Sequence, residues 1–422
     1  MKTSIYKESM TKTKKKIAII GSGITACACA MMLSKKKYKV EIYEKSSKIG
    51  GILRDIQYEK NIFLSGPQYI EKSEWFEKFL RSKNLKKLFK KIDIKYGSYT
   101  DLFENRVSIN KNYAHPITKK PFENLKTILK KSVLDRINSY QPNISEPLNN
   151  WAKNFRQDLE KIHYDCIKQM QISRVFFSNS IKETKEKKLK NAIADDLLGI
   201  PSKNNLRKYY VPKNGYNIVF KTIFNILKKH GVNFNLNSKI KINKRDKLVF
   251  LNDNNEIKAD YILWACNPVP LIKEINNQIL ENPVVKIFTF CFEIKLKSKL
   301  KNDIYFQVFS KKTSINRIYL YKINNRINLN VECFGNKYLT EKIIKKDSLK
   351  ILKKFGYSIK NIKFFVMKKD LRHILFTIKD LESFEKFYTN KDFQNIIPGY
   401  WEEYSREKKI SKILKKISQN DN

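Results

Sequence analysis

The sequence predicts an α/β fold that is built from two domains. The chain has 422 residues, which exceeds the usual size of one domain. Residues 16–54 read as a strand, a glycine turn, a helix and a second strand, whereas residues 280–380 contain segments in which apolar residues alternate at period two. Because 41% of the residues are hydrophobic, both domains can form substantial cores.

Residues 16–54 form one complete βαβ unit. An apolar strand at residues 17–20 leads into Gly21, Ser22 and Gly23, and a helix of small residues follows. Gly21 permits the tight turn, and Gly23 has no Cβ, so the backbone can approach a pyrophosphate that lies on the N–H groups at the helix N-terminus. Ala26 stands where a third glycine is usual.

Glu44 ends the second strand, at the distance expected of the acid that binds ribose hydroxyls. No basic residue occupies that position to accept a 2′-phosphate. We therefore predict a dinucleotide site, and the alternative is an ordinary βαβ turn without a ligand. The predicted contacts of this first unit are Gly21, Ser22, Gly23, Ile24, Thr25, Ala26, Glu44 and Lys45.

Gly50 and Gly51 come six and seven residues after Glu44 and are followed by Arg54. With this doublet the sequence resembles the flavoprotein superfamily of monoamine oxidases, protoporphyrinogen oxidases and UDP-galactopyranose mutases. The resemblance implies FAD rather than NAD as cofactor, with Gly50, Gly51 and Arg54 as further contacts. It also implies a Rossmann-type FAD-binding domain and a second α+β substrate domain, made of an antiparallel sheet and a helical cap.

The resemblance continues outside the first unit. It places Gly66 close to the flavin, with Leu64 standing where the superfamily has an acid and Gln68 where it often has a histidine. Residues 209–268 resemble the return into the FAD domain, where Lys239 and Ile240 would lie against the adenine through backbone groups.

Two further segments carry candidate contacts. Gly399 and Trp401 resemble the glycine-arginine turn before the last helix, with Tyr400 in the arginine's place as a substrate contact. Arg317 matches a strand arginine that meets the substrate diphosphate in mutase-like members, and its planar fork suits phosphate. The alternative for Arg317 is a solvated strand edge.

The predicted domains are discontinuous. Residues 1–13 form a basic tail, residues 14–100, 205–275 and 385–422 form the FAD-binding domain, and residues 101–204 and 276–384 form the substrate and cap domain. The sheet of the second domain is expected to have one buried face. Residues 125–198 have a helical pattern, in which one amphipathic face comprises Trp151, Phe155, Leu159, Ile162 and Cys166.

The formal charge of +45 is compatible with a nucleic-acid binder, a membrane-surface protein or an enzyme for anionic substrates. Because the lysines are spread along the chain and no nucleic-acid-binding motif is present, we interpret the charge as compositional background and expect no specific nucleic-acid partner. The apolar stripe near the C-terminus is expected to pack on the domain, with a membrane-surface helix as the alternative.

The six cysteines form no CxxC pair, so we expect buried free thiols and no metal site. The polar N-terminus does not resemble a secretory signal, and we expect a cytoplasmic protein.

Three functions remain open. The first is an FAD-dependent oxidoreductase of the amine oxidase superfamily, in which the flavin accepts a hydride from an unidentified small molecule. The second is a mutase-like isomerase that acts on a nucleotide sugar through reduced flavin. The third is a degenerate flavin-binding protein without catalysis. The sequence presents no obligatory catalytic side chain and leaves the oligomeric state open.

Overall fold

The computed structural model describes residues 14–35, 38–66, 69–71, 73–81, 83–92, 95–103, 108–110, 131–172, 186, 189–190, 209–244, 248–276, 284–335, 339–403 and 405–421. The chain divides into two compact units. The first unit comprises residues 1–51, 221–275 and 390–422, and the second comprises residues 52–220 and 276–389.

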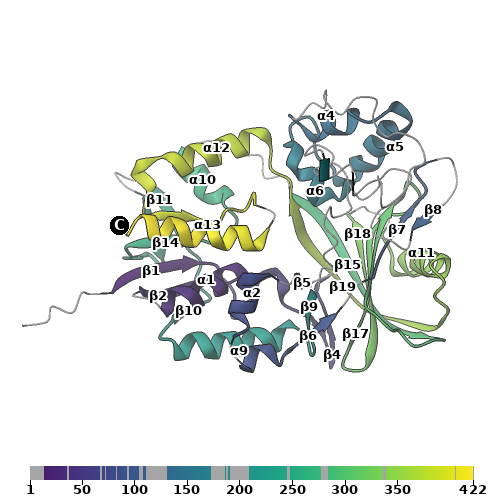
Figure 1. Cartoon of the computed structure of the whole chain (residues 1–422), viewed down its shortest axis with the longest axis horizontal. Helices are drawn as coiled ribbons and strands as arrows, with labels where there is room; N and C mark the ends of the chain where they lie inside the picture. Colours follow the sequence, from purple (N-terminus) through teal and green to yellow (C-terminus); the bar gives the residue numbers. More distant parts are fainter. Residues whose placement is uncertain are drawn as a thin grey trace, which may run out of the picture. The chain divides into compact units, whose positions relative to one another are not determined.

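The first unit contains a five-stranded parallel sheet (Figure 1). Its inner strands consist almost entirely of buried residues, as expected for a parallel sheet covered on both faces. The Rossmann-like core predicted from residues 16–54 is therefore confirmed. In spatial order the strands are β10 (Asn233–Leu236), β2 (Tyr38–Glu44), β1 (Lys15–Ile20), β14 (Tyr261–Trp264) and β20 (Ile396–Pro398).

Helices α1 (Ile24–Ser34) and α13 (Arg406–Gln419) pack against each other in this unit. The predicted C-terminal stripe comprises Ile410, Ile413, Leu414 and Ile417. The three isoleucines are at most 2% exposed and Leu414 is half-buried, so the first unit covers most of the stripe. The burial of this stripe confirms the prediction that it packs on the domain. The remaining elements here are α9 (Tyr216–Lys229), β11 (Lys241–Lys244), β12 (Leu248–Asn252), β13 (Asn255–Glu256) and α10 (Val269–Asn276).

The second unit contains a seven-stranded sheet. Its pairs are antiparallel except for the parallel pair of β16 and β7. One face is apolar and packs against α11 (Glu341–Lys354), which lies beside the sheet in Figure 1. In spatial order the strands are β19 (Ile359–Ile374), β15 (Val284–Leu296), β18 (Arg326–Phe334), β17 (Ile315–Ile323), β16 (Ile304–Phe309), β7 (Lys95–Thr100) and β8 (Ser108–Asn110).

The opposite face of this sheet is also buried and carries polar side chains among aromatic ones, which corrects the prediction of one buried face. Gln307, Asn330 and Glu332 point away from the apolar cluster and are at most 1% exposed. Trp151 covers part of this face through its ring contact with Phe309 at 4.9 Å. The period-two alternation shows that one face of the sheet is more apolar than the other. It does not show which elements pack against the more polar face.

The prediction of one amphipathic helix through residues 151–166 is wrong. Helix α5 ends at Ala152, and after a short 3-10 turn Arg156 adopts φ +54, a left-handed conformation that does not continue a helix. The five predicted residues are nevertheless all buried. The described cap elements are α4 (Val133–Asn138), α5 (Pro142–Ala152), the 3-10 turns Lys153–Phe155 and Tyr164–Cys166, and α6 (Ile167–Met170).

Residues 52–100 and 205–220 fall in the second unit, whereas the sequence-based division placed them in the FAD-binding domain. The reason is strand pairing, because β7 joins the seven-stranded sheet and β9 pairs with both β5 and β6. The small elements of this unit are β3 (Ile56–Tyr58), β4 (Asn61–Phe63), β5 (Ile70–Glu71), α2 (Glu74–Phe79), α3 (Lys83–Lys86), β6 (Phe89–Ile92), β9 (Tyr209–Pro212) and α12 (Ile378–Thr389).

Asp55 caps the first turn of α9 from a distant part of the chain. Its carboxylate accepts hydrogen bonds from the N–H groups of Tyr216 at 2.9 Å and Asn217 at 2.7 Å. Gly215, with φ +86, leaves the carboxylate room, since a Cβ there would lie 2.5 Å from Asp55 Oδ2. The side chain of Asp55 therefore caps the N-terminus of α9.

Burial raises the pKa of the Asp55 carboxyl to about 6, and the hydrogen bonds from Asn217 and Tyr216 partly oppose this shift. The folded state therefore keeps a proton that the unfolded chain releases near pH ~4. The stability contributed by Asp55 is fully present below that pH and is lost as the pH rises through the pKa of the folded state.

We expect urea unfolding to show this loss. Relative to Asp55→Asn, which does not titrate, the wild-type chain should lose roughly 2–3 kcal/mol of unfolding free energy between about pH 4 and pH 7. If the unfolding free energies of the two proteins changed with pH in the same way, the raised pKa of Asp55 would be contradicted.

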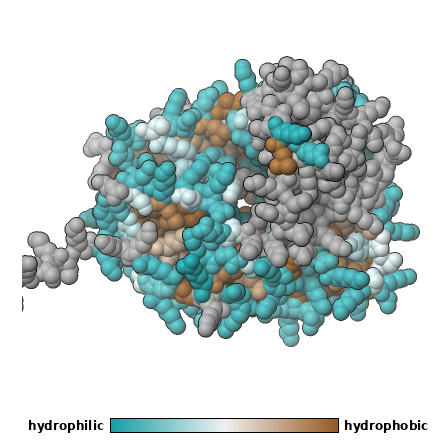
Figure 2. Space-filling model, viewed as in Figure 1, coloured by the Kyte–Doolittle hydropathy of each residue, from teal (hydrophilic) through white to brown (hydrophobic). Residues whose placement is uncertain are grey.

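Hydrophilic side chains cover much of the described surface on the face that Figure 2 shows. In the part of the chain that the structure describes, no helix is both long enough and apolar enough to cross a bilayer.

Candidate functional site

The predicted nucleotide contacts of the first unit gather at the carboxyl edge of its parallel sheet. Gly21 follows β1 and Glu44 ends β2. The strand order changes direction between β1 and β14, and a Cβ on Gly21 would lie 3.3 Å from the Cβ of Cys266, which follows β14. In open α/β sheets, ligands bind at this kind of topological switch point.

The glycine turn leaves open space in front of helix α1. Gly21 has φ +98 and donates its N–H to the carbonyl of Tyr43 at 2.8 Å. Gly23 is the N-cap residue of α1, and a Cβ placed on it would meet no atom of the described residues within 4 Å. In the part of the chain that the structure describes, no side chain caps α1, and the first turn of α1 carries no acidic residue, so the positive helix end is available to an anion.

The glycine doublet folds back onto this turn. Gly50 donates its N–H to the carbonyl of Ser22 at 3.0 Å. Gly51 has φ +57, and a Cβ on it would lie 3.3 Å from the Cα of Gly23. The structure thus brings the doublet and the first glycine turn into direct contact, while the role of Gly50 and Gly51 as cofactor contacts stays a prediction.

Glu44 points toward the glycine turn. Its Oε2 accepts hydrogen bonds from the N–H of Ser22 at 3.0 Å and from the Ser22 hydroxyl at 2.6 Å, and its Oε1 accepts from the N–H of Ser46 at 2.9 Å. A carboxylate offers about four acceptor positions, so these three bonds leave room for a ribose hydroxyl. Ala26, 1% exposed, lets α1 pack closely behind the turn, whereas Lys45 is exposed.

Lys239 and Ile240 lie near the same edge. Ser238 donates its N–H to the carbonyl of Glu44 at 2.9 Å, which holds the segment after β10 against the end of β2. Lys239 is exposed and Ile240 is half-buried. This position agrees with the predicted backbone contact to an adenine, which stays a prediction.

Gly399, Tyr400 and Trp401 follow β20. A Cβ on Gly399 would lie 2.6 Å from the carbonyl oxygen of Trp264, so the chain approaches the end of β14 closely there. Tyr400 has φ +46, and burial raises its pKa to about 12. Lys409, which the sequence analysis missed, lies 5.7 Å from the centre of the Trp401 ring, and burial lowers its pKa to about 8.

In the second unit, Gly66 and Arg317 meet at a buried charge cluster. Glu332 is 1% exposed and pairs with Arg372 (Nη1–Oε1 2.7 Å) and with Arg317 (Nη1–Oε2 3.5 Å). A Cβ on Gly66 would collide with Glu332 Oε1 and would lie 2.5 Å from Arg372 Nη1. Arg54 is half-buried in the same unit.

Sequence reasoning missed Glu332 and Arg372. They lie 40 residues apart and on different strands, so no local spacing relates them. One feature of the sequence could have pointed to this ion pair, because charged residues occur inside segments that otherwise have the pattern of apolar strands.

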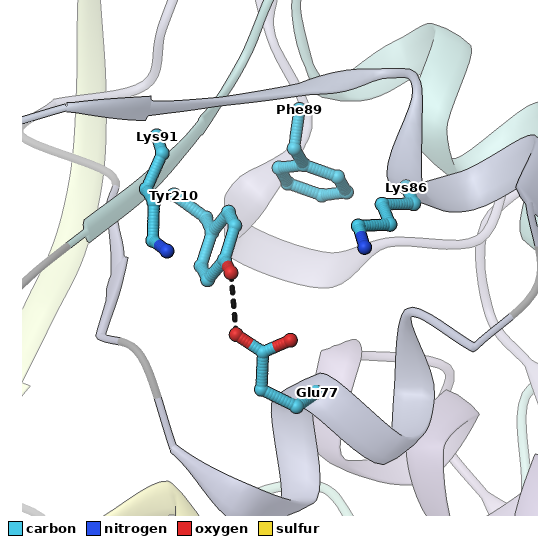
Figure 3. Close-up of a pocket in the computed structure, with 5 residues that line it drawn as sticks. All are labelled: Glu77, Lys86, Phe89, Lys91 and Tyr210. Carbon is cyan, nitrogen blue, oxygen red and sulfur yellow. Dashed lines mark hydrogen bonds between the residues drawn. The ribbon is translucent and has the colours of Figure 1, made fainter.

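One cavity of about 410 Å³ lies in the second unit and is lined by no predicted site residue. Figure 3 shows the carboxylate of Glu77 facing the hydroxyl of Tyr210, which donates a hydrogen bond to it. Burial and this bond raise the pKa of Tyr210 to about 12. The other lining residues are Phe89 and the lysines Lys86 and Lys91, so the cavity has mixed charge.

All six cysteines are free, as predicted. Burial raises the pKa of the Cys29 and Cys266 thiols to about 12, which makes them poor nucleophiles at neutral pH. Among the described residues, no group of three His, Cys, Asp or Glu side chains is arranged to hold a metal ion.

Comparisons with known proteins give one match in sequence and several in fold. Residues 19–91 match the family model of the NAD(P)-binding Rossmann-like domain. No curated protein sequence matches the chain.

Solved structures of three enzymes have the same fold. Reduced UDP-galactopyranose mutase matches with a TM-score of 0.60 and 12% identity, covering 88% of this chain and 86% of that one. A protein of Exiguobacterium sp. 255-15 assigned as a protoporphyrinogen oxidase matches with a TM-score of 0.59, 11% identity and coverage of 96% and 98%. Putrescine oxidase bound to putrescine matches with a TM-score of 0.59, 10% identity and coverage of 97% and 99%. The two-domain α/β prediction is confirmed by this likeness.

Proposed function

We propose that the chain is an FAD-dependent oxidoreductase that acts on a small molecule. The observation that carries the proposal is the open phosphate cradle at Gly23, at the switch point of a parallel sheet, with Glu44 turned toward it. The likeness in fold to putrescine oxidase and to the Exiguobacterium protein supports this reaction class.

The described residues fit the adenosine diphosphate half of FAD. The N-terminus of α1 would hold the diphosphate, the Gly50–Gly51 turn would close over it, and Glu44 would accept a hydrogen bond from a ribose hydroxyl. When bound, FAD would supply a hydride acceptor, and the protein would supply position and electrostatics. Glu44 carries negative charge where NADP would place its 2′-phosphate, which disfavours that cofactor.

The test is a binding experiment with the full chain. After removal of any copurified cofactor, the protein is titrated with FAD, FMN and NAD, and binding is followed by flavin fluorescence and calorimetry. We expect one FAD per chain, with FMN at least ~100-fold weaker, because FMN lacks the half that the cradle would hold. A chain that is purified without flavin and takes up no FAD would contradict the proposal.

The nucleotide-sugar alternative has less support, because the guanidinium of Arg317 is already paired with the buried Glu332. The diphosphate of a nucleotide sugar could pair with Arg317 only by displacing Glu332 from it. Conversion of UDP-hexoses by dithionite-reduced but not by oxidised protein would favour a mutase. Stoichiometric FAD that neither amines nor other substrates reduce would favour a flavin-binding protein without catalysis.

A further inference from the structure

Arg136 is a buried arginine in the cap. It lies in α4, and its side chain is 1% exposed. Val133 and Ile137, three positions before it and one after it, are also buried, so the guanidinium lies on the apolar face of this helix. Arginine keeps its proton in proteins. A full positive charge therefore lies away from water, which is costly unless an acceptor lies against it.

The guanidinium of Arg136 lacks such acceptors. Within the part of the chain that the structure describes, its Nε and Nη1 atoms have no hydrogen-bond partner, and no carboxylate forms an ion pair with it. Both nitrogens are donors only, and neither can rotate to accept a bond instead. The structure thus leaves two buried donors of one cation for an acceptor that the described chain does not supply.

The carboxylates of this region have other partners. Asp135 closes the capping box at the start of α4. Asp165 is exposed and lies 3.3 Å from the ammonium of Lys168. Asp380 is 1% exposed and accepts the N–H of Thr377 at 2.9 Å. The charge of the buried guanidinium is therefore not balanced by a neighbouring acid among the described residues.

Two tyrosines lie beside the guanidinium. The centre of the Tyr164 ring is 5.8 Å from the guanidinium carbon of Arg136, so the ring covers part of the cation. Tyr140 follows one helical turn later and is 3% exposed. Burial raises the pKa of its hydroxyl, and the charge of Arg136 opposes this shift, which shows that the two groups are close. A phenol hydroxyl can donate a hydrogen bond to an anion.

The start of α4 is fixed by backbone and side-chain contacts. Ser132 caps the helix with its side chain and forms a β-bridge with His163, next to Tyr164. The helix that carries Arg136 is therefore anchored to the segment that carries the covering ring. This anchoring holds the guanidinium on the buried side.

We propose that Arg136 is the centre of an anion-binding site in the cap, and that its ligand is a small planar oxyanion of the carboxylate type. The planar fork of arginine matches a carboxylate in shape and in the spacing of its donors. Because the side chain is 1% exposed, the cap has to enclose the anion, which favours a small one. All of these residues belong to the second unit, so the proposal does not depend on FAD.

The experiment follows thermal unfolding of the full chain while test anions replace the bulky sulfonate MES at constant ionic strength. The test anions are formate, acetate, propionate and nitrate. Constant ionic strength is needed because screening by any salt stabilises a chain with a formal charge of +45. Arg136→Met removes the cation and keeps a long unbranched side chain. Lys131→Met is the matched control, since it removes an exposed positive charge just before α4.

We expect formate to raise the melting temperature of the wild-type chain and of Lys131→Met in a saturable way. The rise should be about 5 °C at a roughly hundredfold excess over the dissociation constant. Arg136→Met should show no saturable response. In MES alone this variant should melt no lower than the wild type, because it loses a buried charge that has no partner.

The anion series distinguishes two sources of the carboxylate. If acetate and propionate act as strongly as formate, the natural ligand is the carboxylate end of a larger organic acid. If only formate and nitrate act, the ligand is a free small anion.

A second measurement uses the wild-type chain alone and needs no variant to fold. Amide hydrogen exchange of residues 133–138 is compared in MES and in formate. At the same excess of formate, exchange that requires opening of the site should be roughly a hundredfold slower.

Three results would overturn the proposal. The first is an equal formate response in Arg136→Met, because the anion would then act elsewhere. The second is a melting temperature of Arg136→Met several degrees below that of the wild type in MES alone, because the chain itself would then satisfy the guanidinium. The third is a wild-type chain whose melting temperature and exchange respond to none of the test anions. FAD enters none of these measurements, so they stand whether or not the proposed function holds.

Discussion

Gly23→Ala is expected to fold normally and to lose most of its affinity for FAD. Gly23 has φ −64, which alanine adopts without strain, and the added Cβ would meet no atom of the described part of the chain within 4 Å. The added methyl group would occupy the space through which the diphosphate approaches the N-terminus of α1. We expect FAD affinity, measured by fluorescence titration, to fall roughly tenfold to hundredfold, with the melting temperature unchanged.

The matched control is Gly231→Ala, which also adds a methyl group to open space in the first unit. Gly231 has φ +76 and follows α9, so this variant should lose about 1–2 kcal/mol of stability and keep its FAD affinity. Unchanged FAD binding by Gly23→Ala would mean that the diphosphate does not lie at this turn, and the cofactor site would have to be sought elsewhere.

Gly66→Ala is expected to give the largest loss of stability. The substitution forces alanine into φ +124 and drives its Cβ into Glu332 Oε1 and against Arg372. Backbone strain and the displacement of a buried ion pair should together cost about 2–6 kcal/mol of unfolding free energy, measured by urea titration. The damage should lie in the second unit, which contains all of these residues.

Gly356→Ala separates the two contributions. Gly356 has φ +88 in the same unit, but among the residues that the structure describes no atom would lie within 4 Å of a Cβ there. This variant therefore reports strain alone, at about 1–2 kcal/mol. If both variants lost the same stability, the ion pair would not constrain Gly66.

Residues 16–54 were predicted closely because the determinants are local. An apolar strand, two glycines, a helix of small residues and Glu44 follow one another within 30 residues. Neighbours in sequence become neighbours in a βαβ unit, so the turn at Gly21 and the position of Glu44 at the end of β2 follow from spacing. The strands within residues 284–334 were likewise predicted correctly from the period-two alternation of their apolar residues.

The cap region shows where local patterns mislead. Trp151, Phe155 and Cys166 have helical spacing and are buried, yet Arg156 turns the chain away from a helix. Positions buried in a core are apolar in any backbone conformation. A short stretch can therefore have apolar residues at helical spacing without forming a helix. The buried residues were identified correctly and their secondary structure was not.

The order of residues along the chain determined a βαβ unit with a glycine turn, an alternating sheet and an apolar C-terminal stripe, because each of these depends on spacings of a few residues. Tertiary structure alone decided that Glu332 and Arg372 meet beneath Gly66 and that Asp55 begins helix α9. Those contacts join residues 40 or more positions apart. Their partners are set by how strands pair and pack, and no short-range pattern in the sequence records that pairing.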